Sequence, residues 1–73
     1  MRKSSFEVVD HSDTEVTIRD LNVGISITND AEAVVLTLYQ VFGNVRFFYY
    51  DTDGKRDELC HDGPKFTGFA VLP

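Results

Sequence analysis

The chain has 73 residues, which is enough for one domain with a small core. Its 42% hydrophobic content is too high for a disordered chain. The net charge of −5 excludes the basic footprint on which most nucleic-acid-binding proteins depend. We therefore expect a folded single domain over residues 1–73, with a disordered tail at 1–5. The expected partner is a larger protein, one with a basic surface, and no direct nucleic acid.

Cys60 is the only cysteine, so no internal disulfide can form. Residues 1–13 contain no apolar stretch of signal-peptide length. The longest apolar segment, residues 33–42, is about half the length that a bilayer span requires. These features predict a protein of the reducing cytoplasm, bacterial or phage-infected, that does not enter membranes.

The first half of the chain reads as strands. Residues 6–10 and 15–19 are rich in β-branched side chains and flank a turn-forming segment at 11–14, which predicts a hairpin. A corner is expected at 20–22. Apolar and small residues alternate over 23–28, which predicts a third strand.

A helix is expected over residues 30–42. Asn29 is a favourable N-cap, Asp30 suits the first turn, and Glu32 follows three residues after the cap. Gly43 is a plausible stop signal. The alternative is a strand, because residues 33–42 contain many β-branched and aromatic side chains. The apolar residues at helical spacing are Ala31, Val34, Val35, Leu38, Val41 and Phe42.

Three strands are predicted in the second half, at residues 45–50, 56–61 and 65–72, with a break at Gly63-Pro64. The expected fold is α+β: an antiparallel sheet of five to six strands with one helix packed on it, in chain order βββαβββ. An unpaired outer strand could join two copies of the chain into a homodimer.

The segment 51–54, Asp-Thr-Asp-Gly, resembles the start of a calcium-binding loop. When Gly54 takes the sixth position of an EF-hand loop, Tyr49 takes the first and Cys60 the twelfth, and neither suits calcium. Aspartate first and glycine fourth are instead typical of a type I turn with a bulge. The segment therefore predicts a hairpin turn in which Asp51 pairs with Lys55.

This turn fixes the register of the hairpin: Phe47 faces Leu59, Phe48 faces Glu58, and Arg46 faces Cys60. One face of the hairpin would then be core, formed by Val45, Phe47, Tyr49, Asp57, Leu59 and His61. The other mixes aromatic and charged groups, as protein-binding sites do. The alternative places Phe48 and Tyr50 in the core, under the helix or the last strand. The predicted partner-binding residues are Arg46, Phe48, Tyr50, Arg56 and Glu58.

No catalytic, metal or cofactor site is predicted. Cys60 and His61 are neighbours on a strand, so their side chains point to opposite faces and cannot act as thiolate and base. His11 could replace His61 only if the fold brought it near. One cysteine and two histidines, widely spaced, do not make a zinc site. A small enzyme or ligand-binding protein that uses Cys60 or His61 remains an alternative.

The first alternative, ahead of the enzyme or ligand-binding protein, is a nucleic-acid mimic, in which carboxylates imitate a row of phosphates and block a DNA- or RNA-binding protein. Short, acidic, single-domain chains without a catalytic motif resemble the accessory proteins of phages and mobile elements, and this analogy of type rests on no particular residue. The analogy implies a non-enzymatic inhibitor or regulator of host transcription or defence machinery. The acidic surface of the nucleic-acid mimic would comprise Glu7, Asp10, Asp13, Glu15 and Asp20.

Overall fold

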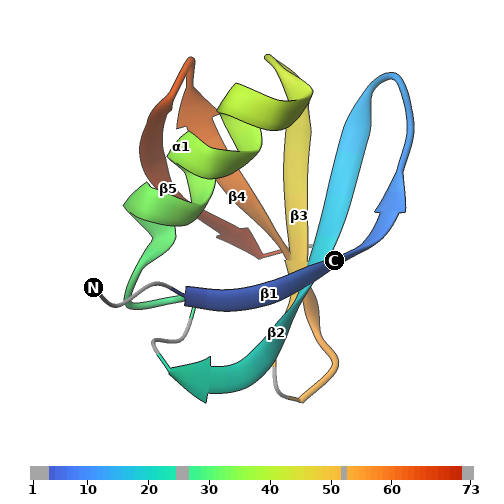
Figure 1. The fold of residues 1–73 in the computed structure, drawn as a ribbon, viewed down its shortest axis with the longest axis vertical. Helices are drawn as coiled ribbons and strands as arrows, with labels where there is room; N and C mark the ends of the chain where they lie inside the picture. Colours follow the sequence, from blue (N-terminus) through green and yellow to red (C-terminus); the bar gives the residue numbers. More distant parts are fainter. Residues whose placement is uncertain (1–3, 25–26, 52, 72–73) are drawn as a thin grey trace.

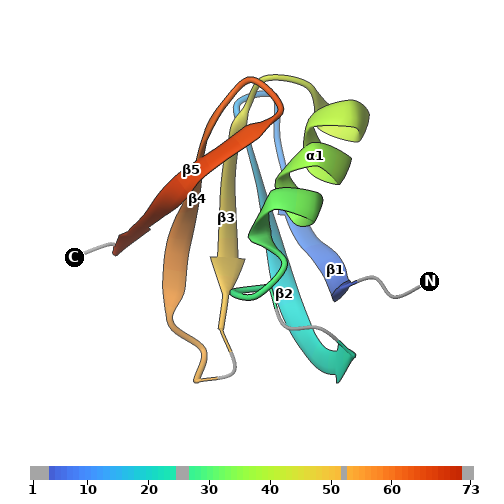
Figure 2. The ribbon, with the colours of Figure 1, turned by 90° about the vertical axis from the view of Figure 1, so that its left-hand side faces the viewer.

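The computed structural model describes residues 4–24, 27–51 and 53–71. One helix lies across one face of a five-stranded sheet (Figures 1 and 2), so the predicted α+β fold is confirmed. Among the described residues no helix is long and apolar enough to cross a membrane. The elements are β1 (Ser4–His11), β2 (Glu15–Gly24), α1 (Ala31–Phe42), β3 (Arg46–Tyr50), β4 (Arg56–Asp62) and β5 (Lys65–Val71).

The strands lie in the sheet in the order in which they occur in the chain, β1-β2-β3-β4-β5. The pairs β1/β2, β3/β4 and β4/β5 are antiparallel, whereas β2 and β3 are parallel. The expectation of a wholly antiparallel sheet is therefore corrected. The reason is α1, which returns the chain from the end of β2 to the start of β3, so that both strands run in the same direction.

The described residues before α1 form two strands instead of the three predicted, so the described order is ββαβββ. The corner predicted at 20–22 lies within β2, where Asp20 pairs with Phe6 of β1. The strand predicted at 23–28 contributes only its first two residues to β2, and positions 25–26 lie outside the described residues. The Asp20 carboxylate accepts a hydrogen bond from the Ile27 amide at 3.3 Å, so it holds the turn that follows β2.

The predicted helix is confirmed at Ala31–Phe42, and the strand alternative for this segment is wrong. Asp30, not Asn29, occupies the N-cap position, and it makes no side-chain capping bond. Gly43 ends the helix with φ of 80° and donates its amide to the Tyr39 carbonyl at 2.9 Å. One face of α1 packs on the sheet. The fully buried core residues are Val16, Ile18, Ile27, Val34, Val35, Leu38, Phe47 and Leu59.

The hairpin turn between β3 and β4 is confirmed. The Asp51 amide donates to the Lys55 carbonyl, and the Gly54 amide donates to the Asp51 carbonyl, both at 3.0 Å. Gly54 has φ of 83°, in the left-handed region that favours glycine. Oδ1 of Asp51 accepts hydrogen bonds from the amides of Asp53 and Lys55 at 2.9 Å, so this oxygen stabilises the turn. Position 52 lies outside the described residues.

The turn produces the predicted register: Phe47 pairs with Leu59, and Phe48 pairs with Glu58. The predicted core side is also confirmed. Phe47 and Leu59 are fully buried and Asp57 is buried, all on the side of the sheet that α1 covers. The register therefore separates the two faces of β3 and β4 as the sequence indicated.

Candidate protein-binding face

The side of the sheet that faces away from α1 is called the open face here. Strand alternation brings all five predicted partner-binding residues to it, because their neighbours in β3 and β4 pack under the helix. The parallel pairing of β2 with β3 adds three residues from β2. The open face comprises Glu15, Thr17, Arg19, Arg46, Phe48, Tyr50, Arg56, Glu58 and Cys60.

Phe48 lies at the centre of the open face, and only 3% of its surface is exposed. Two guanidinium groups cover the ring: that of Arg56 lies 4.0 Å from its centroid and that of Arg46 lies 4.9 Å away. The alternative that placed Phe48 in the core is right that the ring is buried, but the ring does not belong to the cluster that packs under α1. The ring is excluded from water by arginine side chains on the opposite face.

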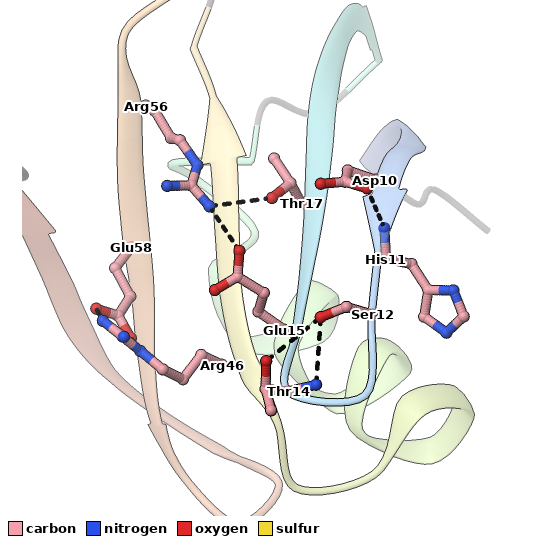
Figure 3. Close-up of polar contacts among 9 residues, drawn as sticks. All are labelled: Asp10, His11, Ser12, Thr14, Glu15, Thr17, Arg46, Arg56 and Glu58. Atoms are coloured by element: carbon pink, nitrogen blue, oxygen red, sulfur yellow. Dashed lines mark hydrogen bonds and ion pairs between the residues drawn. The ribbon is translucent and has the colours of Figure 1, made fainter.

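Each arginine of the open face pairs with a glutamate on another strand. Arg46 bonds Glu58 through two nitrogens, with Nε to Oε2 at 3.1 Å and Nη2 to Oε1 at 2.9 Å. Arg56 reaches across β3 to β2, where Nη2 donates to Glu15 Oε1 at 3.2 Å and to Thr17 Oγ1 at 3.3 Å (Figure 3).

The third pair joins Arg19 to Glu7 of β1. Positive and negative groups therefore alternate across the sheet and balance locally, although the whole chain carries −5. With Glu7 of β1 counted beside Arg19, three arginines balance three glutamates, so the open face and this neighbour form a neutral, charge-alternating surface on an acidic protein.

The Arg46–Glu58 pair shifts both partners toward their charged forms. The hydrogen bond to Glu58 and its negative charge raise the pKa of Arg46 above its ordinary value. The hydrogen bond from Arg46 lowers the pKa of Glu58, against an opposing effect of burial. Only 16% of the Glu58 side chain is exposed, compared with 62% for Arg46. The guanidinium is therefore the more exposed half of this ion pair.

Sequence reasoning missed Thr17 and Arg19 as members of this face and assigned Glu15 only to the acidic set. The alternation of Glu15, Thr17 and Arg19 with Val16 and Ile18 indicated a solvent-facing side of the strand. Recognising that this side continues into β3 requires the parallel β2/β3 pairing. A strand–helix–strand order is the signal that could have revealed it.

The five acids of the proposed mimic surface do not form an unbroken negative row. Glu7 and Glu15 are paired with arginines. Asp10 Oδ1 accepts from the backbone amide of His11 at 2.9 Å, and Asp20 accepts from a backbone amide after β2. Asp13 is exposed in the turn between β1 and β2. The mimic stays a prediction, and this arrangement gives it no specific support.

Cys60 and His61 occupy opposite faces of β4. Burial raises the pKa of the Cys60 thiol, and the Glu58 carboxylate adds to this effect while Arg46 opposes it. A raised pKa reduces the thiolate fraction that a nucleophile needs. His11 contacts Phe42 of α1, with 5.0 Å between ring centroids. Within the described ranges, no three His, Cys, Asp or Glu side chains are grouped so that they could hold a metal.

The His61 ring lies on the helix side, stacked on Phe47 with 4.2 Å between centroids. Its Nδ1 lies 2.7 Å from the Gly63 carbonyl oxygen, and its Nε2 lies 2.7 Å from that of Val45. Both carbonyls are acceptors, so both contacts are hydrogen bonds only when each ring nitrogen carries a proton. This geometry makes His61 a connection between the β4–β5 turn and the start of β3.

No protein-family model, curated protein or solved structure matches this chain. The open face is therefore a candidate on its geometry alone.

Proposed function

We propose that this protein is a non-enzymatic binding module that docks on a larger protein machine through its open face and modulates it. The observation that carries the proposal is the array around Phe48, where two arginines cover an aromatic ring on the face that α1 leaves uncovered. Arginine and aromatic side chains are the residue types that contribute most to protein–protein binding. The proposed role is that of a phage or mobile-element accessory protein that regulates host transcription or defence machinery.

The ion pairs prepare this face for binding. Arg46 and Arg56 are held by Glu58 and Glu15 before any partner arrives, so less side-chain entropy is lost on docking. Alternating charges favour a partner with the complementary pattern and disfavour others. The remaining surface carries the net negative charge and would draw a basic partner toward the molecule.

The test is affinity capture followed by binding measurements on the captured partner. The double variant R46E/E58R keeps an ion pair at this position but reverses its polarity, so it changes what a partner meets while preserving the cross-strand contact. Tyr50→Ala removes a half-buried ring of the same face. Each change should weaken binding by at least about tenfold, as expected for residues central to an interface.

The matched control is Gln40→Ala, an exposed position on the far side of the molecule, in α1. It should leave the affinity unchanged, and circular dichroism should show the wild-type fold for all variants. If R46E/E58R and Tyr50→Ala bind the same partner as tightly as the wild type, the open face is not the docking surface.

A further inference from the structure

The half-buried ring of His61 joins three segments at the end of the β3/β4 ladder. The paired residues of that ladder end at Phe47 opposite Leu59, so Val45 and His61 lie beyond it. The ring spans this place, because Nε2 lies 2.7 Å from the Val45 carbonyl oxygen and Nδ1 lies 2.7 Å from that of Gly63. One side chain of β4 therefore contacts both the start of β3 and the turn between β4 and β5.

Packing fixes the position of the ring. It stacks on Phe47, with 4.2 Å between the ring centroids and 16° between the ring planes. The β4/β5 ladder shifts register between Cys60 and His61, and such irregularities re-aim the side chains beside them. A ring held in this way keeps both of its nitrogens directed at carbonyl oxygens.

The two carbonyl oxygens make the arrangement depend on the protonation of the ring. Carbonyl oxygens only accept, so a ring with two protons donates two hydrogen bonds here, both from a charged group. A neutral ring donates from one nitrogen, and its other nitrogen then directs a lone pair at an oxygen 2.7 Å away. The folded geometry therefore favours the charged ring over the neutral one.

Other charged groups near the ring also act on its protonation. Asp62 and Lys65 are exposed and pair with each other across the β4–β5 turn. The side chains that β3 and α1 pack on the same core are apolar, apart from the phenol of Tyr39. After the hydrogen bond and charge of Arg46, the positive charge of His61 also lowers the pKa of Glu58, so this carboxylate favours the charged ring as well.

We propose that His61 is a pH-dependent clamp, which in its doubly protonated form connects the β4–β5 turn to the start of β3 and releases one of them when it loses a proton. The stability that the clamp contributes is complete below about pH 6, where a histidine of the unfolded chain is also protonated. It is lost as the pH rises, because the neutral ring can donate to only one of the two carbonyls. The segment that is loosened is the hairpin of β4 and β5, at one edge of the sheet.

Urea denaturation of the whole chain between pH 6 and pH 8.5 tests the clamp. The comparison is with His61→Gln, whose side chain cannot take a charge. Over this range the equilibrium constant for unfolding should rise at least about tenfold more in the wild type than in this variant, as expected for one charge-assisted hydrogen bond. The matched control is His11→Gln, which replaces the other histidine of the chain, an exposed residue. It should keep the pH dependence of the wild type.

Measurements on the wild type alone keep the test independent of how well the variants fold. At pH 7 the nitrogen-15 chemical shifts of the His61 ring should be those of a doubly protonated imidazole. Amide hydrogen exchange, corrected for the intrinsic effect of pH, should show less protection of residues 62–71 at pH 8.5 than at pH 6, with β1 unchanged.

Four outcomes overturn the proposal. They are a neutral His61 ring at pH 7, equal protection of residues 62–71 at both pH values, a pH dependence that survives in His61→Gln, and one that disappears in His11→Gln. None of these measurements involves a binding partner, so their result is separate from the test of the docking surface.

Discussion

The ring of Phe48 is shielded from water by side chains of the sheet itself and not by a helix or a second sheet packed on it. The guanidinium groups of Arg46 and Arg56 lie against its ring, and their glutamate partners hold them there. A cation over an aromatic ring contributes about 0.5–2 kcal/mol, depending on how much water is excluded. An ion pair that is weak on a bare surface therefore gains a second role here, because it fixes the side chain that covers the ring.

The lowered pKa of Glu58 predicts how acid affects stability. Its carboxylate takes up protons less readily in the folded chain than in the unfolded chain, where the ordinary value is 4.5. The contribution of the Arg46 pair is therefore complete above that value and is lost as the pH falls through the lower folded value. Glu58→Gln should lower the free energy of unfolding at pH 7 by about 0.5–1 kcal/mol. It should also reduce the loss of stability on acidification.

Urea denaturation at pH 7 and at acidic pH measures both effects. Asp13→Asn is the control, since it removes an exposed carboxylate from the turn between β1 and β2. Its acid dependence should match that of the wild type. If Glu58→Gln loses as much stability on acidification as the wild type does, the ion pair does not hold Glu58 in its charged form.

At the scale of the elements, the features that follow from short-range sequence signals were predicted correctly. Pairing between residues far apart in the sequence was not. The β3–β4 register follows from Asp51 and Gly54, because a tight turn determines which residues face each other. The end of β2 could not be located in this way. The apolar positions change from even at Val16 and Ile18 to odd at Val23, which indicates a corner between them, and the sequence does not reveal that Asp20 stays in the ladder with Phe6.

The residues that the open face takes from β3 and β4 were predictable, whereas those it takes from β2 were not. Its residues from β3 and β4 share one hairpin, so local alternation groups them correctly. Glu15, Thr17 and Arg19 join them only through the parallel contact of β2 with β3. Arg56 meets Glu15 across 41 positions of sequence, and no periodic pattern encodes such a contact.

The β3–β4 turn gives a prediction at this scale. Gly54 has φ of 83°, and a Cβ there would meet nothing within 4 Å. The cost of a substitution is therefore conformational and not steric. Gly54→Ala should lower the free energy of unfolding by about 1–2 kcal/mol, and Gly54→Asn should cost less, because asparagine tolerates the left-handed region. Lys55→Ala, at the exposed neighbour, is the control in the same denaturation series. Equal stability of Gly54→Ala and the wild type would contradict this account of the turn.

At the scale of the whole molecule, one core connects every buried element. Leu38 and Val35 of α1 pack with residues of β2, β3 and β4, so the helix has no separate core of its own. Isolated helices of about 12 residues are marginal in water. We therefore expect helix and sheet to unfold together in a single transition, as in most domains of this size.

Leu36 and Leu38 test this expectation with the same substitution on two faces of one helix. Leu38 is 1% exposed and belongs to the core, whereas Leu36 is 45% exposed. Leu38→Ala should lower the free energy of unfolding by about 2–5 kcal/mol through lost burial and the cavity that remains. Leu36→Ala should change it by less than about 0.5 kcal/mol. Far-ultraviolet circular dichroism and tyrosine fluorescence should report the same midpoint for each variant. If the tyrosine fluorescence changes at a denaturant concentration at which the helix signal still persists, α1 folds independently of the sheet.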